Sequence, residues 1–458
     1  MIKDTIAAIS TGMTNSGIGK VRMSGNGAIA IADQVYRSPG GQKCLSDADS
    51  HTIHYGYIYD GDRLIDEVLV LIMKAPRSYT TEDMVEIDCH GGVVVMKKIL
   101  ETVIKYGARP AEPGEFTKRA FLSGRIDLTQ AEAVIDVINA KNEYALSSSV
   151  RQLKGSVFNK IKEIRTNIIG NVAFIEAALD DPEHINADDF GETLKVQVDE
   201  NIRDLKRLLD SADNGRILRE GIKTVILGKP NAGKSSLLNA LVGQERAIVT
   251  DIAGTTRDTL EESINIHGIP LNIIDTAGIR ATEDVVERIG VDRARTFAQD
   301  ADLIIYVVDG STALDENDAE ILEMISDKKA IVLLNKIDLN LVTTQDILRE
   351  KTKHPILEIS AREEQGMDDF ENLLKDMFFD GKLSFNDEIY ITNIRHKTAI
   401  SEALDSLRLV QESIEAGMPE DFFSIDLMNA YETLGGIIGE SAGEDLIDTI
   451  FSDFCMGK

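Results

Sequence analysis

The segment GKPNAGKS, at Gly228–Ser235, is the part of the sequence that decides the fold. It follows the apolar run Thr224–Leu227, which reads as a strand, and precedes Ser236–Leu241, which reads as a helix. A strand, a glycine-rich loop and a helix in this order surround phosphate oxygens with backbone N–H groups and the positive helix N-terminus. Lys234 then reaches the terminal phosphates, and the Ser235 hydroxyl binds Mg²⁺. The segment predicts a nucleoside triphosphate site.

Two downstream motifs determine the base. Asn335-Lys336-Ile337-Asp338 follows the buried-strand pattern Ala330–Leu334, and Ser360-Ala361-Arg362 follows the strand-like Pro355–Ile359. The Asp338 carboxylate can accept hydrogen bonds from guanine N1–H and the 2-amino group, which adenine lacks. The Ser360–Arg362 loop is placed to present a backbone N–H to the guanine carbonyl. The motifs predict guanine.

Two segments between these motifs are predicted to sense the γ-phosphate. Asp275-Thr276-Ala277-Gly278 ends the strand-like Leu271–Ile274 and places a carboxylate near Mg²⁺ and a glycine N–H near the γ-phosphate. The loop Thr250–Asp258 offers Thr256 to complete the metal shell. Both segments are predicted switch regions. For Arg257 and Asp258, in the same loop, a solvated ion pair and a switch role stay equally open.

Together these motifs define the predicted nucleotide site. The residues predicted to bind GTP are Asn231, Ala232, Gly233, Lys234, Ser235, Ser236, Thr250, Asp251, Ile252, Ala253, Gly254, Thr255, Thr256, Asp275, Thr276, Ala277, Gly278, Asn335, Lys336, Asp338, Ser360, Ala361 and Arg362. Ser235 and Thr256 are the predicted Mg²⁺ ligands.

The composition fits a multidomain protein with an acidic surface. At 458 residues the chain exceeds what one core organises, so we expect roughly three domains. The net charge of −29 argues against indiscriminate nucleic-acid binding, but RNA contact stays possible through local positive charge or a second protein. Three widely spaced cysteines exclude a disulfide framework. With no secretory signal and no apolar run of bilayer length, we expect a cytoplasmic protein without a transmembrane segment.

Hydrophobic periodicity indicates how the chain is organised. The first section predicts mixed α and β structure, with a hairpin at Tyr59–Asp62, a strand at Met84–Cys89 and a helix at Val93–Tyr106. Helical spacing then dominates from about residue 117 to 213, and it returns in His396–Gly417 and Ser424–Phe454. Two helical blocks around an α/β insert suggest one bundle built from both.

These patterns predict a multidomain α/β and α protein. Its expected parts are an N-terminal α+β domain at 1–118, to which the family resemblance given below adds folate binding, a discontinuous helical bundle at 119–220 and 382–458, and an inserted Ras-like P-loop GTPase domain with a mostly parallel sheet at 221–381.

Four further segments are specific enough to indicate a family. They are Gly254–Asp258, Pro113–Phe116, Leu128–Ala133 and Phe454–Lys458. A generic small GTPase lacks the last three of these segments. On these motifs the sequence resembles, over essentially its whole length, the tRNA-modifying GTPase family called MnmE or TrmE. The resemblance implies a GTP-hydrolysing enzyme that works with a flavin-containing partner, MnmG. Together they would add an aminomethyl-type group at C5 of the wobble uridine of certain tRNAs.

The resemblance also implies a one-carbon donor, 5-formyl- or methylene-tetrahydrofolate, bound by an N-terminal domain that forms a homodimer. Matched residue by residue, the folate contacts fall on Arg22, Glu82, Arg125 and Lys458. Cationic groups at three of these positions suit an anionic glutamyl tail, and the carboxylate suits the N–H edge of a pterin.

The predicted catalytic residues are Glu287, Asn231 and Lys234. Small GTPases place a water-orienting glutamine directly after the Asp-x-x-Gly glycine, but here the hydrophobic Ile279 cannot position water. The resemblance implies that Glu287 takes this task and that two nucleotide domains pair face to face. The Asn231 amide could hold a K⁺ ion that replaces an arginine finger. The other predicted K⁺ ligands are Thr250, Ile252 and Thr255.

Cys455 leaves two interpretations open. A thiolate could add to a pyrimidine ring and activate C5, or the residue is a small side chain packed at the end of the last helix. The second is favoured, because only Lys458 is near enough in sequence to stabilise a thiolate.

Two other functions compete with the family interpretation. A ribosome-assembly or translational GTPase predicts a basic patch or an RNA-binding module, and the sequence contains neither. A folate-binding scaffold switched by GTP predicts negligible turnover.

Overall fold

The structure, a computed structural model of the chain, describes residues 4–41, 44–140, 142–181, 184, 190–244, 262–266, 269–274, 298–299, 301–379, 389–419, 421–440, 443–452 and 454–458. The chain divides into two compact units. Unit 1 comprises residues 1–138, 150–202 and 402–458, and unit 2 comprises 139–149 and 203–401. Four helices contribute residues to both units: α4 (Leu128–Asn139), α5 (Glu143–Leu153), α7 (Phe190–Glu220) and α14 (Ile394–Glu415).

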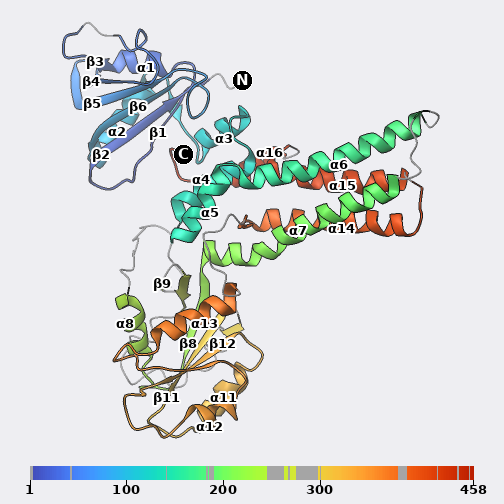
Figure 1. Cartoon of the computed structure of the whole chain (residues 1–458). Helices are drawn as coiled ribbons and strands as arrows, with labels where there is room; N and C mark the ends of the chain where they lie inside the picture. The colour runs from blue at the N-terminus through green and yellow to red at the C-terminus, as the bar shows by residue number, and fades with distance from the viewer. Residues whose placement is uncertain are drawn as a thin grey trace. The chain divides into compact units, whose positions relative to one another are not determined.

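Unit 1 contains a seven-stranded sheet of order β3-β4-β5-β6-β2-β1-β7 (Figure 1). Neighbouring strands are antiparallel except β1 and β7, which are parallel. The strands are β1 (Ile6–Ile9), β2 (Ser16–Ser24), β3 (Tyr36–Arg37), β4 (Thr52–Asp60), β5 (Arg63–Met73), β6 (Met84–Gly91) and β7 (Arg109–Pro110). The predicted hairpin is confirmed, because β4 and β5 pair across a turn in which Gly61 has a φ of +62°.

The two faces of this sheet have different environments. Along β5, Val68, Val70 and Ile72 are buried in a core that includes residues of α1 (Ala28–Val35) and α2 (Val93–Lys105). Because side chains alternate along a strand, Leu69 points to the other face, where it is 44% exposed. One face therefore carries the core, and the other presents apolar side chains outward.

The remaining helices of unit 1 are α3 (Glu115–Leu122), α6 (Ser156–Asp180), α15 (Asp421–Ile438) and α16 (Glu444–Ser452). The helical stretch predicted at Ser424–Phe454 forms two helices, α15 and α16. Gly439 ends the first with a φ of +90°, and a Cβ there would lie 2.9 Å from that of Leu128. Glycine at this position permits both the left-handed backbone and the close packing on α4.

Unit 2 contains a six-stranded sheet of order β13-β12-β11-β8-β10-β9 (Figure 1). All neighbouring pairs are parallel except β9 and β10, which confirms the predicted mostly parallel sheet. The strands are β8 (Ile222–Leu227), β9 (Glu262–Ile266), β10 (Ile269–Ile273), β11 (Leu303–Asp309), β12 (Ala330–Asn335) and β13 (Ile356–Glu358).

Helices cover both faces of the unit 2 sheet. One core joins alternate strand residues to α8 (Lys234–Gln244) and α13 (Met367–Phe379). A second core joins the intervening strand residues to α11 (Glu316–Met324) and α12 (Gln345–Arg349). Burial on both faces explains why these strands are continuous apolar runs rather than alternating patterns. Across both units, no described helix combines the length and the apolar character that crossing a membrane requires.

Candidate functional site

Glycine is required at both ends of the loop between β8 and α8. Gly228 has a φ of +151°, and a Cβ there would lie 2.5 Å from the carbonyl oxygen of Val307. Gly233 has a φ of +101°, and its Cβ would lie 2.1 Å from Nδ2 of Asn335. Any side chain at either position would have to displace a neighbouring strand or that amide. The strand, loop and helix therefore meet in the predicted order.

The Lys234 side chain folds back over this loop. Its Nζ donates hydrogen bonds to the carbonyl oxygens of Gly228 and Lys229, each at 2.7 Å. Burial lowers the pKa of Lys234, because the ammonium is partly removed from water. A partly desolvated cation held by neutral carbonyls is well suited to gain an anionic phosphate partner.

Asn335, at the end of β12, connects two of the predicted motifs to the phosphate loop. Its Nδ2 donates to the carbonyl oxygen of Ala232 at 2.9 Å, and its Oδ1 accepts from the backbone N–H of Ala361 at 3.0 Å. This one buried amide therefore links the loop after β8 to the turn after β13. The loop predicted to contact the phosphates and the turn predicted to contact the base are therefore joined through the Asn335 side chain.

The residues predicted to recognise the base are held by local contacts. The Ser360 hydroxyl donates to Oδ1 of Asp338 at 2.7 Å, which orients this carboxylate. Lys336 has a φ of +68°, and its Nζ donates to Oδ2 of Asp309 at 2.6 Å. Burial alone would raise the pKa of Asp309, but hydrogen bonds from Lys336 and Ser311 lower it overall, so the carboxylate stays ionised. Asp309 was not predicted, although a carboxylate ending the apolar strand β11 is a signal that could have identified it.

Four other predicted residues of the nucleotide site are exposed. Asn231 lies in the loop with a φ of +62°, and Ser235 and Ser236 lie in the first turn of α8. Arg362 is also exposed, with its Nε 4.0 Å from Oε1 of Glu363. The rest of the predicted nucleotide site lies outside the described residues: Thr250, Asp251, Ile252, Ala253, Gly254, Thr255, Thr256, Asp275, Thr276, Ala277, Gly278 and Glu287.

A second cluster lies in unit 1, around the ring of Tyr79. The Arg125 guanidinium lies 4.8 Å from the ring centroid and donates to the Tyr79 carbonyl oxygen at 3.0 Å. The Arg22 guanidinium lies 5.8 Å from the same centroid and donates to Oε1 of Glu86 at 2.8 Å. Arg22 also donates to the carbonyl oxygen of Gly457 at 3.2 Å. Tyr79 was not predicted, yet it connects two of the predicted folate residues.

Lys458 and Glu82 belong to the same region. The Lys458 carbonyl oxygen accepts from the backbone N–H of Phe116, whose ring lies 5.6 Å from the Arg22 guanidinium. Burial, followed by the charge of Arg22, lowers the pKa of Lys458. Glu82 accepts from the Ser24 hydroxyl at 2.7 Å and from Nη1 of Arg119 at 3.1 Å. The four residues matched to folate contacts therefore come from distant parts of the sequence to one region of unit 1.

Cys455 is an exposed free thiol, close enough to Lys458 for its charge to act on the pKa of that lysine. It is therefore not the packed side chain that the favoured sequence interpretation expected, and its chemical role stays a prediction.

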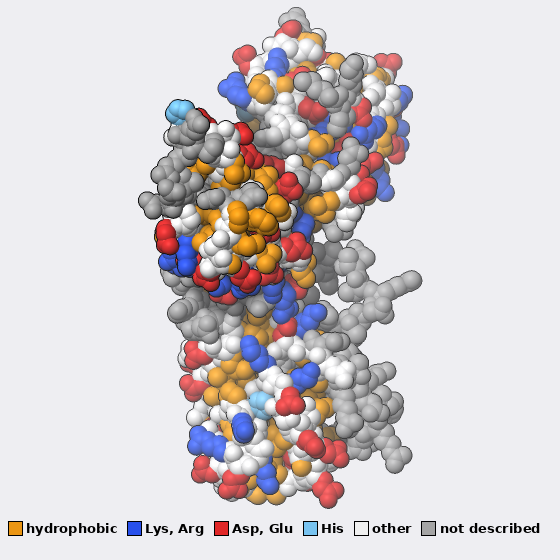
Figure 2. Space-filling view, turned by 90° about the vertical axis from the view of Figure 1, so that its right-hand side faces the viewer, with side chains coloured by type: hydrophobic (Ala, Val, Ile, Leu, Met, Phe, Trp, Pro, Cys, Tyr) orange, Lys and Arg blue, Asp and Glu red, His pale blue; other side chains and the backbone are white. Residues whose placement is uncertain are grey.

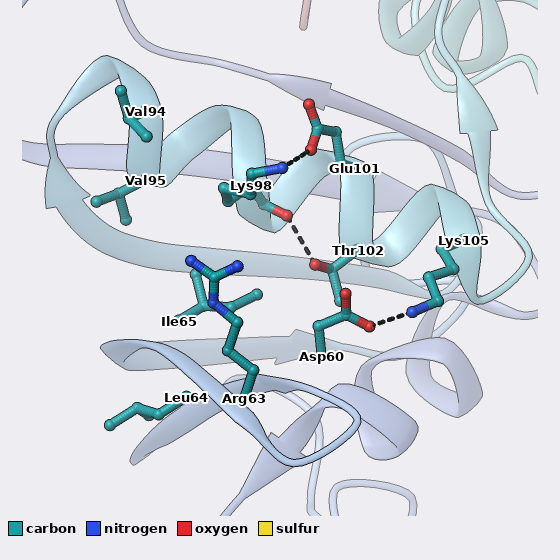
Figure 3. Close-up of a pocket in the computed structure, with 10 residues that line it drawn as sticks. All are labelled: Asp60, Arg63, Leu64, Ile65, Val94, Val95, Lys98, Glu101, Thr102 and Lys105. Atoms are coloured by element: carbon teal, nitrogen blue, oxygen red, sulfur yellow. Dashed lines mark hydrogen bonds and ion pairs between the residues drawn. The ribbon is translucent and has the colours of Figure 1, made fainter.

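Figure 3 shows a pocket of about 300 Å³ between the β4–β5 hairpin and α2. Arg63, Lys98 and Lys105 are its basic side chains, and the two lysines are paired with Glu101 and Asp60, respectively. The pocket contains none of the predicted nucleotide or folate residues.

Comparisons with known proteins cover almost the entire chain. Residues 5–125 match the family model described as the GTP-binding protein TrmE N-terminus, and residues 128–455 match that of the MnmE helical domain. The tRNA modification GTPase MnmE of Lachnoclostridium phytofermentans is 60% identical over 458 residues, which cover 100% of both chains. That of Clostridioides difficile is 48% identical over 458 residues, again covering 100% of both.

Among solved structures, the G domain of the T. maritima FeoB iron transporter matches with 24% sequence identity and a TM-score of 0.25. The match covers 33% of this chain and 94% of that one.

Proposed function

The chain belongs to the MnmE (TrmE) family of tRNA modification GTPases, and on that premise we propose that it couples GTP hydrolysis to modification of the wobble uridine of certain tRNAs at C5. The product would carry an aminomethyl-type group. The observation that supports the nucleotide part is the Asn335 side chain, which joins the phosphate loop at Ala232 to the turn at Ala361. Such a link fixes the position of the phosphate-binding loop relative to the base-binding turn.

Within this proposal, GTP is held by the residues named in the sequence analysis. The hydroxyls of Ser235 and Thr256 would hold Mg²⁺, which would supply positive charge to the phosphates. The domain ranges 1–118, 119–220, 221–381 and 382–458 are part of the same proposal. Reconstitution tests it: with tRNA, MnmG and a folate donor, the chain is expected to produce the modified uridine only when GTP is hydrolysed. Equal product with a non-hydrolysable GTP analogue would contradict the coupling.

We also propose that the unit 1 cluster binds 5-formyl- or methylene-tetrahydrofolate as the one-carbon donor. Arg22 and Arg125 offer two cationic groups at one aromatic ring, and Lys458 offers a third close enough to Arg22 for its pKa to be lowered by that charge, which suits an anionic glutamyl tail. Glu82 suits the N–H edge of the pterin. The contact between Arg119 and Glu82 keeps a cation beside this carboxylate.

Replacing Arg22 with alanine is expected to weaken 5-formyl-tetrahydrofolate binding by about tenfold or more, because a charge-assisted contact is lost. GTP turnover is expected to survive. Isothermal titration calorimetry measures the first effect and phosphate release the second. Arg37→Ala is the matched control, since Arg37 also lies over a tyrosine ring, that of Tyr59 at 4.2 Å. Folate affinity that is unchanged in Arg22→Ala would move the site elsewhere.

The proposed hydrolysis mechanism depends on K⁺. Asn231, with Thr250, Ile252 and Thr255, would hold the ion where an arginine finger would otherwise place its charge. Glu287 would orient the attacking water. Asn231 supports the ion-binding part of this proposal, because its amide is exposed on the phosphate loop.

GTP turnover is expected to be about tenfold or more faster in K⁺ than in Na⁺ at matched ionic strength, because only one ion has the size for this site. Asn231→Ala is expected to remove this difference, whereas Asn239→Ala, an exposed amide on α8, keeps it. Glu287→Ala is expected to lower turnover by about 10²-fold with GTP affinity nearly intact. Initial rates of phosphate release in K⁺ and in Na⁺ measure these effects for the wild type and each variant. Equal rates in both salts, with normal nucleotide binding, would show the cation mechanism to be wrong.

We propose that the chain forms a homodimer through its N-terminal domain and assembles with MnmG in a cytoplasmic complex. The face of the unit 1 sheet opposite its core supports the homodimer. On this face Ile53 and Tyr55 of β4 are 63% and 47% exposed, beside Leu69 of β5. The charge distribution supports the assembly with MnmG. On the face in Figure 2, acidic and basic side chains are interspersed among the described residues without a broad basic area. A partner that carries much of the RNA contact would explain this surface.

A further inference from the structure

Lys229, the second residue of the phosphate loop, sends its side chain away from the loop toward the start of α11. Its Nζ lies 2.7 Å from Oδ2 of Asp318 and 3.0 Å from Oδ2 of Asp315. Asp315 caps α11, and Asp318 completes a capping box with it. The lysine is therefore attached to a helix end whose own geometry is fixed by reciprocal hydrogen bonds.

The attachment continues into the core of unit 2. The Asp318 side chain is only 2% exposed, and its Oδ1 accepts from the hydroxyl of Tyr306 at 2.6 Å. Tyr306 lies on β11 and is fully buried. Burial and the neighbouring Asp318 raise the pKa of Tyr306, so the hydroxyl stays a donor. Asp318 thus joins Lys229 to the central sheet.

The backbone of Lys229 connects the same residue to the phosphate-binding lysine. Its carbonyl oxygen accepts from Nζ of Lys234 at 2.7 Å and from the N–H of Ala232 at 3.2 Å. A shift of Lys229 would therefore move one of the two carbonyls that hold the Lys234 ammonium. The side-chain contacts of Lys229 and the placement of Lys234 are mechanically linked.

We propose that Lys229 is a positioning residue, anchored by Asp318 and Asp315, that presets the phosphate loop and the Lys234 ammonium for the triphosphate. This inference rests on the proposed nucleotide site and adds a role for residues outside its contact set. A direct phosphate contact by Lys229 is the competing explanation. It would require the ammonium to leave a buried carboxylate without its cationic partner, which is costly.

A double-mutant cycle in the full-length chain tests the proposal. Lys229→Met is expected to weaken GTP binding by about tenfold and Asp318→Asn by about fivefold, because each removes the anchor. The double variant is expected to match Lys229→Met rather than the product of both losses. Lys229→Arg, which keeps the ion pair, is expected to bind within about twofold of the wild type. Lys375→Met is the matched control, since it breaks the lysine–carboxylate pair with Glu371 on α13.

Binding is read with a fluorescent GTP analogue, and thermal unfolding without nucleotide identifies any variant that fails to fold. If Lys229→Met is unfolded, Asp318→Asn and Lys229→Arg still decide the question. Tighter binding in Asp318→Asn would assign Lys229 to direct phosphate contact and overturn the proposal. Unchanged affinity in both single variants, or losses that multiply in the double variant, would also overturn it. Absent GTP binding in the wild type would instead refute the nucleotide site itself.

Discussion

Replacing Asp338 with asparagine is expected to lower GTP affinity by about 100-fold or more and to create affinity for xanthosine triphosphate. The Ser360 hydroxyl donates to Oδ1 of Asp338 and can still donate to the amide oxygen of the variant. The amide NH₂ then faces the base, where a second acceptor stood before. A donor at this position opposes the guanine amino group and matches the carbonyl that xanthine carries there.

Competition between the two nucleotides for a fluorescent analogue measures this change in base preference. Asp368→Asn, a carboxylate in the first turn of α13, is the control with the same chemical change. Retained GTP affinity in Asp338→Asn, without a gain for xanthosine triphosphate, would contradict the assignment of guanine.

Replacing Lys234 with alanine is expected to abolish tight GTP binding, with a loss of about 1,000-fold or more. The substitution removes the partly buried ammonium and leaves the carbonyl oxygens of Gly228 and Lys229 without this donor. The loop would then offer oxygen atoms where the triphosphate needs positive charge. Calorimetric titration with GTP measures the loss.

Lys351→Ala is the control for Lys234→Ala, because Lys351 is an exposed lysine of the same unit. The thermal unfolding midpoint of nucleotide-free Lys234→Ala is expected to stay close to that of the wild type. Micromolar GTP affinity in this variant would show that the loop binds phosphate by other means.

The phosphate loop could be predicted because its requirements are local. The apolar strand, the glycines and Lys234 are consecutive in sequence, and each has a conformational or chemical reason to be there. The Asn335 bridge could not be predicted in the same way. Its partners Ala232 and Ala361 lie 103 and 26 residues away, and the three meet only because β8 and β12 end at one edge of the sheet.

Other features depended on tertiary contacts that sequence patterns do not contain. The spacing of apolar residues continues through Ser424–Phe454, so it did not reveal that Gly439 ends a helix there. The contact between Lys229 and Asp318 spans 89 residues and looks, in sequence, like two ordinary surface charges. Tyr79 likewise could be identified only from the structure, in which Arg22 and Arg125, distant in sequence, both lie over its ring.

Whether this GTPase acts on the wobble uridine of tRNA can be measured by nucleoside analysis of total tRNA from a strain that lacks the chain. The C5 aminomethyl-type modification is expected to disappear in that strain. The wild-type chain should restore it, and Lys234→Ala should not. Wobble uridines that stay fully modified in the deletion strain would contradict the account.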